Sequence, residues 1–269
     1  MRSSNPVLTR LTPETQAGQQ QPYGQPQAGY GYGSPYDTMP AQAPTLPESE
    51  RMTVDDVVVR TVSLLAITGI AGVAAAYLVT QTPSLLGPIW LGGMIIGLIL
   101  GMVISFSRVT NPALIITYAV VEGAFLGGVS ALFNAIWPGI VIQAIIGTFA
   151  IFFVMAGLYK ARIIRNSPKF TRGLIGALIA AAAVILLRFI LSAFGVSTFL
   201  SDGGPVAILI SLAIIVIGAL TFVLDFDMVE QAVAAGAPKV LAWRCGFGIL
   251  VGLIWVYLEV LRLLSYFRE

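Results

Sequence analysis

Residues 205–224 read PVAILISLAIIVIGALTFVL, twenty consecutive positions without a charged side chain. A helix rises about 1.5 Å per residue, so a run of this length matches the roughly 30 Å apolar thickness of a bilayer. The whole chain has the same character, because 57% of its 269 residues are hydrophobic and 10% are charged. A soluble domain carries about 25% charged residues. The sequence therefore predicts an integral membrane protein.

Further apolar runs flank this one, and each is bounded by prolines or glycines, which favour the positions where helices begin or end. Together they predict an all-α bundle of seven membrane-spanning helices, at 60–80, 88–107, 112–134, 139–160, 172–195, 205–224 and 240–264. Glycines recur at four-residue spacing within three of these spans, at Gly93, Gly97 and Gly101, at Gly123 and Gly127, and at Gly248 and Gly252. Such faces let membrane helices approach closely, which indicates a compact bundle.

Residues 1–55 form a separate N-terminal tail that is rich in Gln, Pro, Gly and Tyr. Its central stretch, residues 16–44, contains no Val, Leu or Ile and cannot bury enough apolar surface to fold, so we expect disorder. The tail has no apolar core of the kind found in signal peptides. It serves either as a solubilising segment or as a docking element for membrane-protein partners, and residues 56–269 form the transmembrane domain.

Lys and Arg residues are distributed unevenly between the two sides of the predicted bundle. Ten flank span ends on the side of the tail: Arg51, Arg60, Arg108, Lys160, Arg162, Arg165, Lys169, Arg172, Lys239 and Arg244. The opposite side has Arg268 alone. Cytoplasmic loops of membrane proteins carry the excess of Lys and Arg. We therefore expect a cytoplasmic N-terminus and, with seven spans, an external C-terminus.

The absence of some residue types excludes several function classes. The chain contains no histidine, which removes Ser-His hydrolysis, His-ligated zinc or haem, and pH sensing by histidine. The Gly-x-Gly-Asp motif of aspartyl intramembrane proteases is also missing. The net charge of +2 comes without a basic stripe, so no nucleic acid is expected as a partner. We expect a protein that is not an enzyme, has no cofactor and takes the lipid bilayer as its surroundings.

Ionisable side chains inside membrane spans are costly, so each is a functional candidate. Glu122 lies near the middle of its span with no cation within helical reach. It must find a partner on another helix, contact water or stay protonated. Asp225 and Asp227 lie where the sixth span meets the cytoplasm, and they either act in function or form an interfacial salt-bridge cluster with Lys239 and Arg244.

Three further charges lie toward the opposite side of the bundle. Glu259 and Arg262 are three residues apart on one helix and can neutralise each other. Arg188, in the outer half of the fifth span, either snorkels outward or pairs with Glu259.

Two segments resemble the last two helices of the Bax inhibitor-1 family, also called the YccA or TMBIM family. They are FVLDFDMVEQ at 222–231 and WVYLEVLRLLSYF at 255–267. In that family an aromatic-Asp pair ends helix six, and an aromatic-Leu-acid-aliphatic motif marks helix seven. The opening RSSNPV at 2–7 and the tail are similar to an actinobacterial branch. The resemblance implies a seven-helix bundle with a central seventh helix in a bacterial plasma membrane.

The resemblance also implies a function. Family members are described as pH-sensitive calcium leak channels or cation transporters, in which carboxylates of helices six and seven form a proton-sensing gate. Carried onto this chain, the pair is Asp227 and Glu259, with Asp225 as the other candidate partner of Glu259. Two carboxylates held close share a proton at low pH and repel each other when both are ionised. Their oxygens also suit Ca²⁺, which makes them candidate ligands for a passing ion.

Two features depart from the family pattern. Many relatives pair a glutamate of helix two with an arginine at that helix's cytoplasmic end. Here Arg108 is present but the span 88–107 has no acid, so this latch is missing or Glu122 replaces it. In addition, Glu259 is expected about 15 Å deeper than Asp227 at about 1.5 Å per residue.

The alternative function is a non-conducting protein that stabilises or regulates other membrane proteins through its tail or bundle. A continuous polar path joining the carboxylates would favour transport.

Overall fold

The computed structural model describes residues 47, 50–107, 109–195 and 203–268, and the predicted disorder of the tail concerns residues outside these ranges. The elements are α1 (Val54–Gln81), the short 3₁₀ helix η3 (Pro83–Leu85), α2 (Leu86–Phe106), α3 (Pro112–Ile136), α4 (Ile140–Lys160), α5 (Pro168–Ala193), α6 (Pro205–Ala234) and α7 (Leu241–Tyr266). All seven α-helices of the described chain are long and apolar enough to cross a membrane. The predicted fold class is confirmed.

The helix boundaries have local causes in the sequence. Asn111 and Ser167 cap α3 and α5 by accepting a hydrogen bond from a backbone N–H of the first turn, and each is followed by a proline. Thr53 and Asp56 form a capping box at the start of α1. Gly236 follows the end of α6 with a φ of 64°, a conformation that glycine adopts without strain.

Two helices extend at least six residues beyond the predicted spans. Helix α1 begins at Val54 because its capping box lies there, so Asp55 belongs to the helix rather than to the tail. Helix α6 continues for ten residues past Leu224, to Ala234. Asp225 and Asp227 therefore lie within a helix, not at its end.

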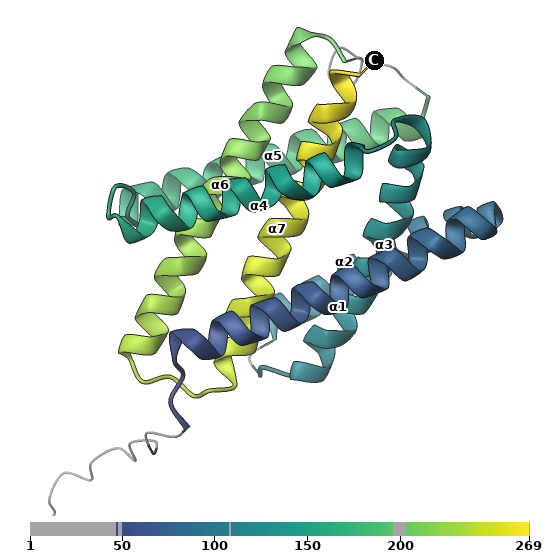
Figure 1. Ribbon diagram of the computed structural model, residues 1–269. Helices are drawn as coiled ribbons and strands as arrows, with labels where there is room; N and C mark the ends of the chain where they lie inside the picture. Colours follow the sequence, from purple (N-terminus) through teal and green to yellow (C-terminus); the bar gives the residue numbers. More distant parts are fainter. Residues whose placement is uncertain (1–46, 48–49, 108, 196–202, 269) are drawn as a thin grey trace, which may run out of the picture. The chain divides into compact units, whose positions relative to one another are not determined.

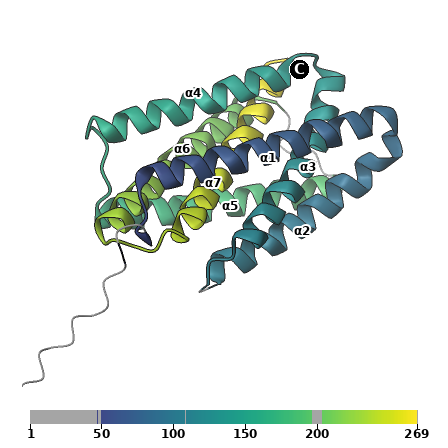
Figure 2. The ribbon, with the colours of Figure 1, turned by 60° about the horizontal axis from the view of Figure 1, so that its bottom comes forward.

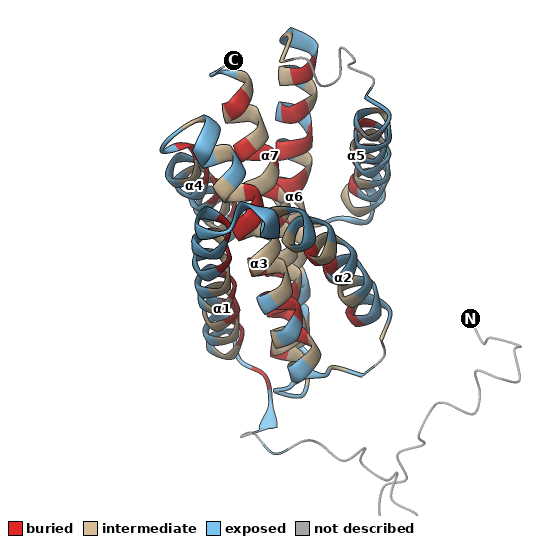
Figure 3. Cartoon of the chain, turned by 90° about the vertical axis from the view of Figure 1, so that its right-hand side faces the viewer, coloured by how far each residue is buried: buried red, intermediate tan, exposed pale blue. Residues whose placement is uncertain are grey.

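Helix α7 holds the bundle together. It packs against α1, α3, α4 and α6, whereas α2 packs mainly on α3 and α5 on α6 (Figures 1 and 2). More of α7 is buried than of any other helix in the described chain. Figure 3 shows buried residues concentrated on α6 and α7, while α5 is largely exposed. The buried residues of α5 form one stripe at seven-residue spacing, Leu174, Ala181 and Arg188.

The closest packing joins α1 and α3. A β-carbon at Gly123 would collide with the backbone oxygen of Thr68, and one at Gly127 would collide with the backbone oxygen of Gly72. The four-residue glycine spacing in α3 therefore has the packing role that the sequence predicts.

Candidate functional site

The two ends of the bundle differ in charge. We call the end that carries the start of α1, the α4–α5 loop and the α6–α7 turn the basic end, and the end that carries the α3–α4 loop and the C-terminus the far end. At the far end, Arg268 donates hydrogen bonds to the Pro138 carbonyl oxygen at 3.0 Å and to Gln143 at 2.8 Å.

Asp225 lies in the interface between α6 and α7. A β-carbon at Gly248 of α7 would lie 3.1 Å from Asp225 Oδ1, so the absence of a side chain at position 248 makes room for the carboxylate. Asp225 is half-buried, and no described residue forms a hydrogen bond or ion pair with its carboxylate. An acid held in this way within a membrane-spanning helix is a functional candidate on energetic grounds.

An apolar layer separates Asp225 from the far end. Phe222 and Val256 are fully buried, and Phe222 packs edge-on against Phe152 of α4 with ring centroids 5.2 Å apart. A β-carbon at Gly252 would lie 2.8 Å from Phe222 Cε1, so this ring fills the space that Gly252 leaves. We call Phe222, Gly252 and Val256, with Gly218 opposite Val256, the apolar plug.

Glu259 lies beyond the apolar plug. It is eleven residues further along α7 than Gly248, which is about 16 Å of helix at about 1.5 Å per residue. The structure therefore does not bring Asp225 or Asp227 close to Glu259. Instead of forming a carboxylate pair, Asp225 and Glu259 lie at different depths of the α6–α7 interface.

The direct partner of Glu259 is Arg262. Arg262 Nη1 lies 3.2 Å from Glu259 Oε1, so these residues neutralise each other along α7. The Glu259 carboxylate is buried, with 4% of the residue exposed, and its Oε2 atom has no hydrogen-bond partner among the described residues.

Arg188 and Ser211 bring α5 and α6 to the same place. Arg188 is 5% exposed and acts electrostatically on Glu259, Arg262 and Tyr266, so it points inward rather than snorkelling. Its guanidinium nitrogens form no hydrogen bond within the described chain, and Ser211, which lies near Glu259, likewise has an unbonded hydroxyl. Arg188 thus lies near Glu259 without forming the direct pair that the sequence allowed.

Asp227 belongs to a separate polar group at the basic end. It accepts hydrogen bonds from Asn166 Nδ2 at 2.7 Å and from Gln231 Nε2 at 2.6 Å. Tyr159 donates to Glu230 at 2.6 Å close by. These contacts tie the α4–α5 loop to the last turns of α6.

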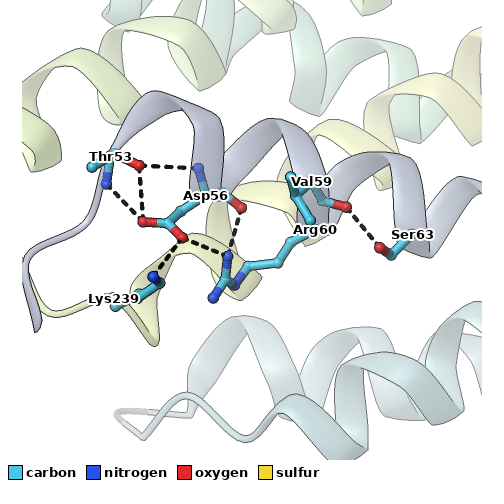
Figure 4. A network of polar contacts seen from close by, with 6 residues as sticks. All are labelled: Thr53, Asp56, Val59, Arg60, Ser63 and Lys239. Atoms are coloured by element: carbon cyan, nitrogen blue, oxygen red, sulfur yellow. Dashed lines mark hydrogen bonds and ion pairs between the residues drawn. The ribbon is translucent and has the colours of Figure 1, made fainter. Parts of the chain in front are cut away.

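The cations expected near Asp225 and Asp227 have other partners. Lys239 Nζ lies 3.2 Å from Asp56 Oδ1, and the same carboxylate also binds Arg60 at 3.0 Å (Figure 4). Arg244 donates to the carbonyl oxygens of Ser105 and Ser107 at the end of α2, both at 2.9 Å. The interfacial salt-bridge cluster considered from the sequence is therefore not formed with either aspartate.

Glu122 reaches across the α2–α3 interface. Its Oε2 atom occupies the space beside Gly97 of α2, where a β-carbon would collide with it. No described residue forms an ion pair with Glu122, and Arg108 lies outside the described residues. Glu122 thus places an acid on the face of α2, the helix that lacks one of its own.

No cluster of three or more Asp, Glu or Cys side chains that can hold a metal occurs in the described ranges. Asp225, Asp227 and Glu259 are too far apart along their helices to act as one set of ligands.

A comparison with protein families places these features in context. The family model described as Bax inhibitor 1 like matches residues 5–269 of the chain. The chain belongs to this family. The resemblance read from residues 222–231 and 255–267 is therefore confirmed. A comparison with curated proteins gives no match.

Within this Bax inhibitor 1 like bundle, several site residues are absent from the sequence-based prediction. Ser211, Asn166 and Phe222 are ordinary residue types for a membrane helix or a loop, and their roles come from contacts between distant segments. The Thr53–Asp56 spacing, by contrast, is a capping-box signal that reading the sequence alone can find. It would also have placed the start of α1 correctly.

Proposed function

We propose that the protein is a pH-sensitive cation channel or transporter that passes Ca²⁺, as a leak or in exchange for protons, under the control of carboxylates in α6 and α7. The observation that carries this proposal is Asp225, an acid inside a membrane-spanning helix without a cation or hydrogen-bond donor among the described residues. In this proposal the basic end, with its excess of Lys and Arg, faces the cytoplasm, and the cell is bacterial, as the resemblance to an actinobacterial branch implies.

The positions of Asp225 and Glu259 support two acids that a cation meets one after the other, rather than one pair that binds it together. A cation entering from the basic end meets Asp225, then the apolar plug, and then Glu259 beyond it. Hydrophobic constrictions can close a pore by excluding water. Gly218, Gly248 and Gly252 place no side chains in the α6–α7 interface. Phe222 occupies the space beside Gly252, so a small shift of one helix would reposition this ring.

The dependence on pH has a defined sign. An ionised Asp225 or Glu259 attracts a cation, and its protonation removes that attraction. Flux is therefore expected to rise as pH rises through the range in which these carboxylates lose their protons. The proposal requires no enzymatic activity and no cofactor.

The test is Ca²⁺ flux into liposomes that contain the full-length chain, measured against pH. Replacing Asp225 by Asn or Glu259 by Gln should flatten the pH dependence. The matched control is Glu230→Gln, which neutralises an acid of α6 that binds Tyr159 and lies outside the α6–α7 interface. Phe222→Leu trims the apolar plug and should raise flux at every pH.

The second candidate is a non-conducting protein that stabilises or regulates other membrane proteins. The packing of Phe222 and Val256 favours it, because both apolar side chains are fully buried between Asp225 and Glu259. Flux no greater than that of protein-free liposomes at any pH would select this candidate. Unchanged pH dependence in folded Asp225→Asn and Glu259→Gln proteins would reject the carboxylate gate alone.

A further inference from the structure

A recess of about 380 Å³ lies between α1 and α4, with α3 and α7 at its base. We call it the lateral pocket, and its walls include Thr68, Gly69, Ile145, Phe149, Leu253 and Tyr257. Gly69 and Ile145 are both exposed, so the recess opens sideways from the bundle rather than toward either end. Its volume lies in the range of about 300–1,000 Å³ that is usual for sites that bind small molecules.

The hydroxyl protons of the lateral pocket are already donated within the protein. Its wall carries four hydroxyl groups, those of Thr68, Ser130, Thr148 and Tyr257. Ser130 and Tyr257 bond to each other at 2.6 Å. Thr68 and Thr148 donate to backbone carbonyl oxygens at 3.2 and 2.8 Å. A polar ligand would find no free hydrogen-bond donor on these side chains, and the rest of the wall is apolar or glycine, so the chemistry of the wall favours a hydrocarbon.

The surroundings of the pocket supply that hydrocarbon. Its rim is continuous with the lipid-facing surface of α1 and α4, where Ile70, Val73, Ile142 and Ile146 are all exposed. These residues lie in membrane-spanning helices, so lipid acyl chains surround the mouth of the pocket. We propose that the lateral pocket binds one acyl chain of a bilayer lipid.

A lipid chain is thin and flexible enough to enter between α1 and α4. This binding is independent of whether the protein conducts ions.

The test uses photocrosslinking in the intact membrane protein. The full-length chain is reconstituted in phosphatidylcholine vesicles that contain a phosphatidylcholine with a diazirine in one acyl chain. After illumination, the labelled residues are mapped by mass spectrometry. Adducts should concentrate on the wall of the lateral pocket, above the level on the exposed face of α5 around Ile179.

Two substitutions fill the pocket from opposite walls, and each has a matched control. A β-carbon at Gly69 meets no atom within 4 Å, so the backbone there has room for Gly69→Leu, and a β-carbon at Gly176, on the exposed face of α5, is equally free, which makes Gly176→Leu the control. Ile145→Trp fills the pocket from α4, whereas Ile146→Trp adds the same bulk at the next residue, outside the pocket wall. Each filling variant should lose the pocket adducts and keep those on α5, and both controls should keep all adducts.

Three outcomes would overturn the proposal. Labelling of the pocket wall no denser than labelling of α5 would show ordinary lipid contact without a site. Pocket adducts that persist in both filling variants would place the bound chain elsewhere. Crosslinks between two copies of the protein at these residues would identify the occupant as a second copy. Retained labelling of α5 shows that each variant is folded and inserted.

Discussion

The partner of Glu259 can be decided by two double-mutant cycles, which compare Arg262 with Arg188. The changes are Glu259→Gln, Arg262→Met and Arg188→Met, singly and in pairs. Methionine keeps an unbranched apolar side chain and removes the charge. The structure predicts that Glu259 is coupled energetically to Arg262 more strongly than to Arg188.

The geometry of the pair sets the magnitude. Its N–O distance is 3.2 Å, with 5% of the Glu259 side chain and 37% of the Arg262 side chain exposed. An exposed helix pair at this spacing contributes about 0.2–0.5 kcal/mol. Removing one partner from a buried pair costs about 3–5 kcal/mol. One side chain is buried here and the other is partly open, so we expect a coupling energy of about 1–2 kcal/mol, intermediate between these limits.

Arg188 should behave differently. It acts on Glu259 electrostatically but forms no hydrogen bond within the described chain. We expect a coupling energy below about 0.5 kcal/mol, as found for residues without a shared contact. Because replacing a buried, unbonded charge by an apolar group is often neutral or stabilising, Arg188→Met alone should cost little.

The assay is reversible unfolding in mixed micelles of dodecyl maltoside and sodium dodecyl sulfate, followed by tryptophan fluorescence. The chain has four tryptophans, which provide the signal. An Arg188–Glu259 coupling equal to or larger than that of Arg262 would refute the reasoning. It would mean that the Arg188 guanidinium reaches the free Oε2 atom of Glu259.

Three further predictions follow from other parts of the bundle. Gly127→Ala should destabilise the protein by about 1–3 kcal/mol through its collision with the backbone of Gly72, whereas Gly176→Ala should not, as unfolding in mixed micelles will show. Asp56→Ala removes a capping box and two ion pairs and should cost about 1–2 kcal/mol, and Asp55→Ala, which changes no capping contact, should cost less than half as much. In a Cys245→Ala background, a cysteine that replaces Arg165 should react with an impermeant maleimide only from the cytoplasmic side, and one that replaces Arg268 only from outside. The reverse pattern would contradict the proposed orientation.

The features that could be predicted from the sequence are those set by nearest neighbours along the chain. Twenty uncharged residues before Asp225 are enough to predict a span, and Asn111-Pro112 is enough to predict where a helix begins. The pairing of Glu259 with Arg262 is also local, because three residues along a helix bring two side chains together.

Contacts between distant helices could not be predicted in this way. Glu122 faces Gly97 because α2 and α3 pack in one particular register, and no pattern within either helix specifies that register. Lys239 forms an ion pair with Asp56, although 183 positions separate the two residues in the sequence. The place of Asp225 within α6 rather than at its end could not be predicted, because α6 continues beyond its apolar run and hydrophobicity alone does not report where a helix ends.

The segment just before α1 has a consequence for how force could reach the α6–α7 interface. Met52 donates a backbone hydrogen bond to Ala237 at 2.7 Å, and Lys239 donates one to Glu50 at 2.8 Å. These bonds fasten the chain before α1 to the turn that joins α6 to α7. A partner that pulled on the N-terminal tail would therefore strain this turn before it strained the apolar helices. The turn between α6 and α7 would then transmit the force to the start of α7.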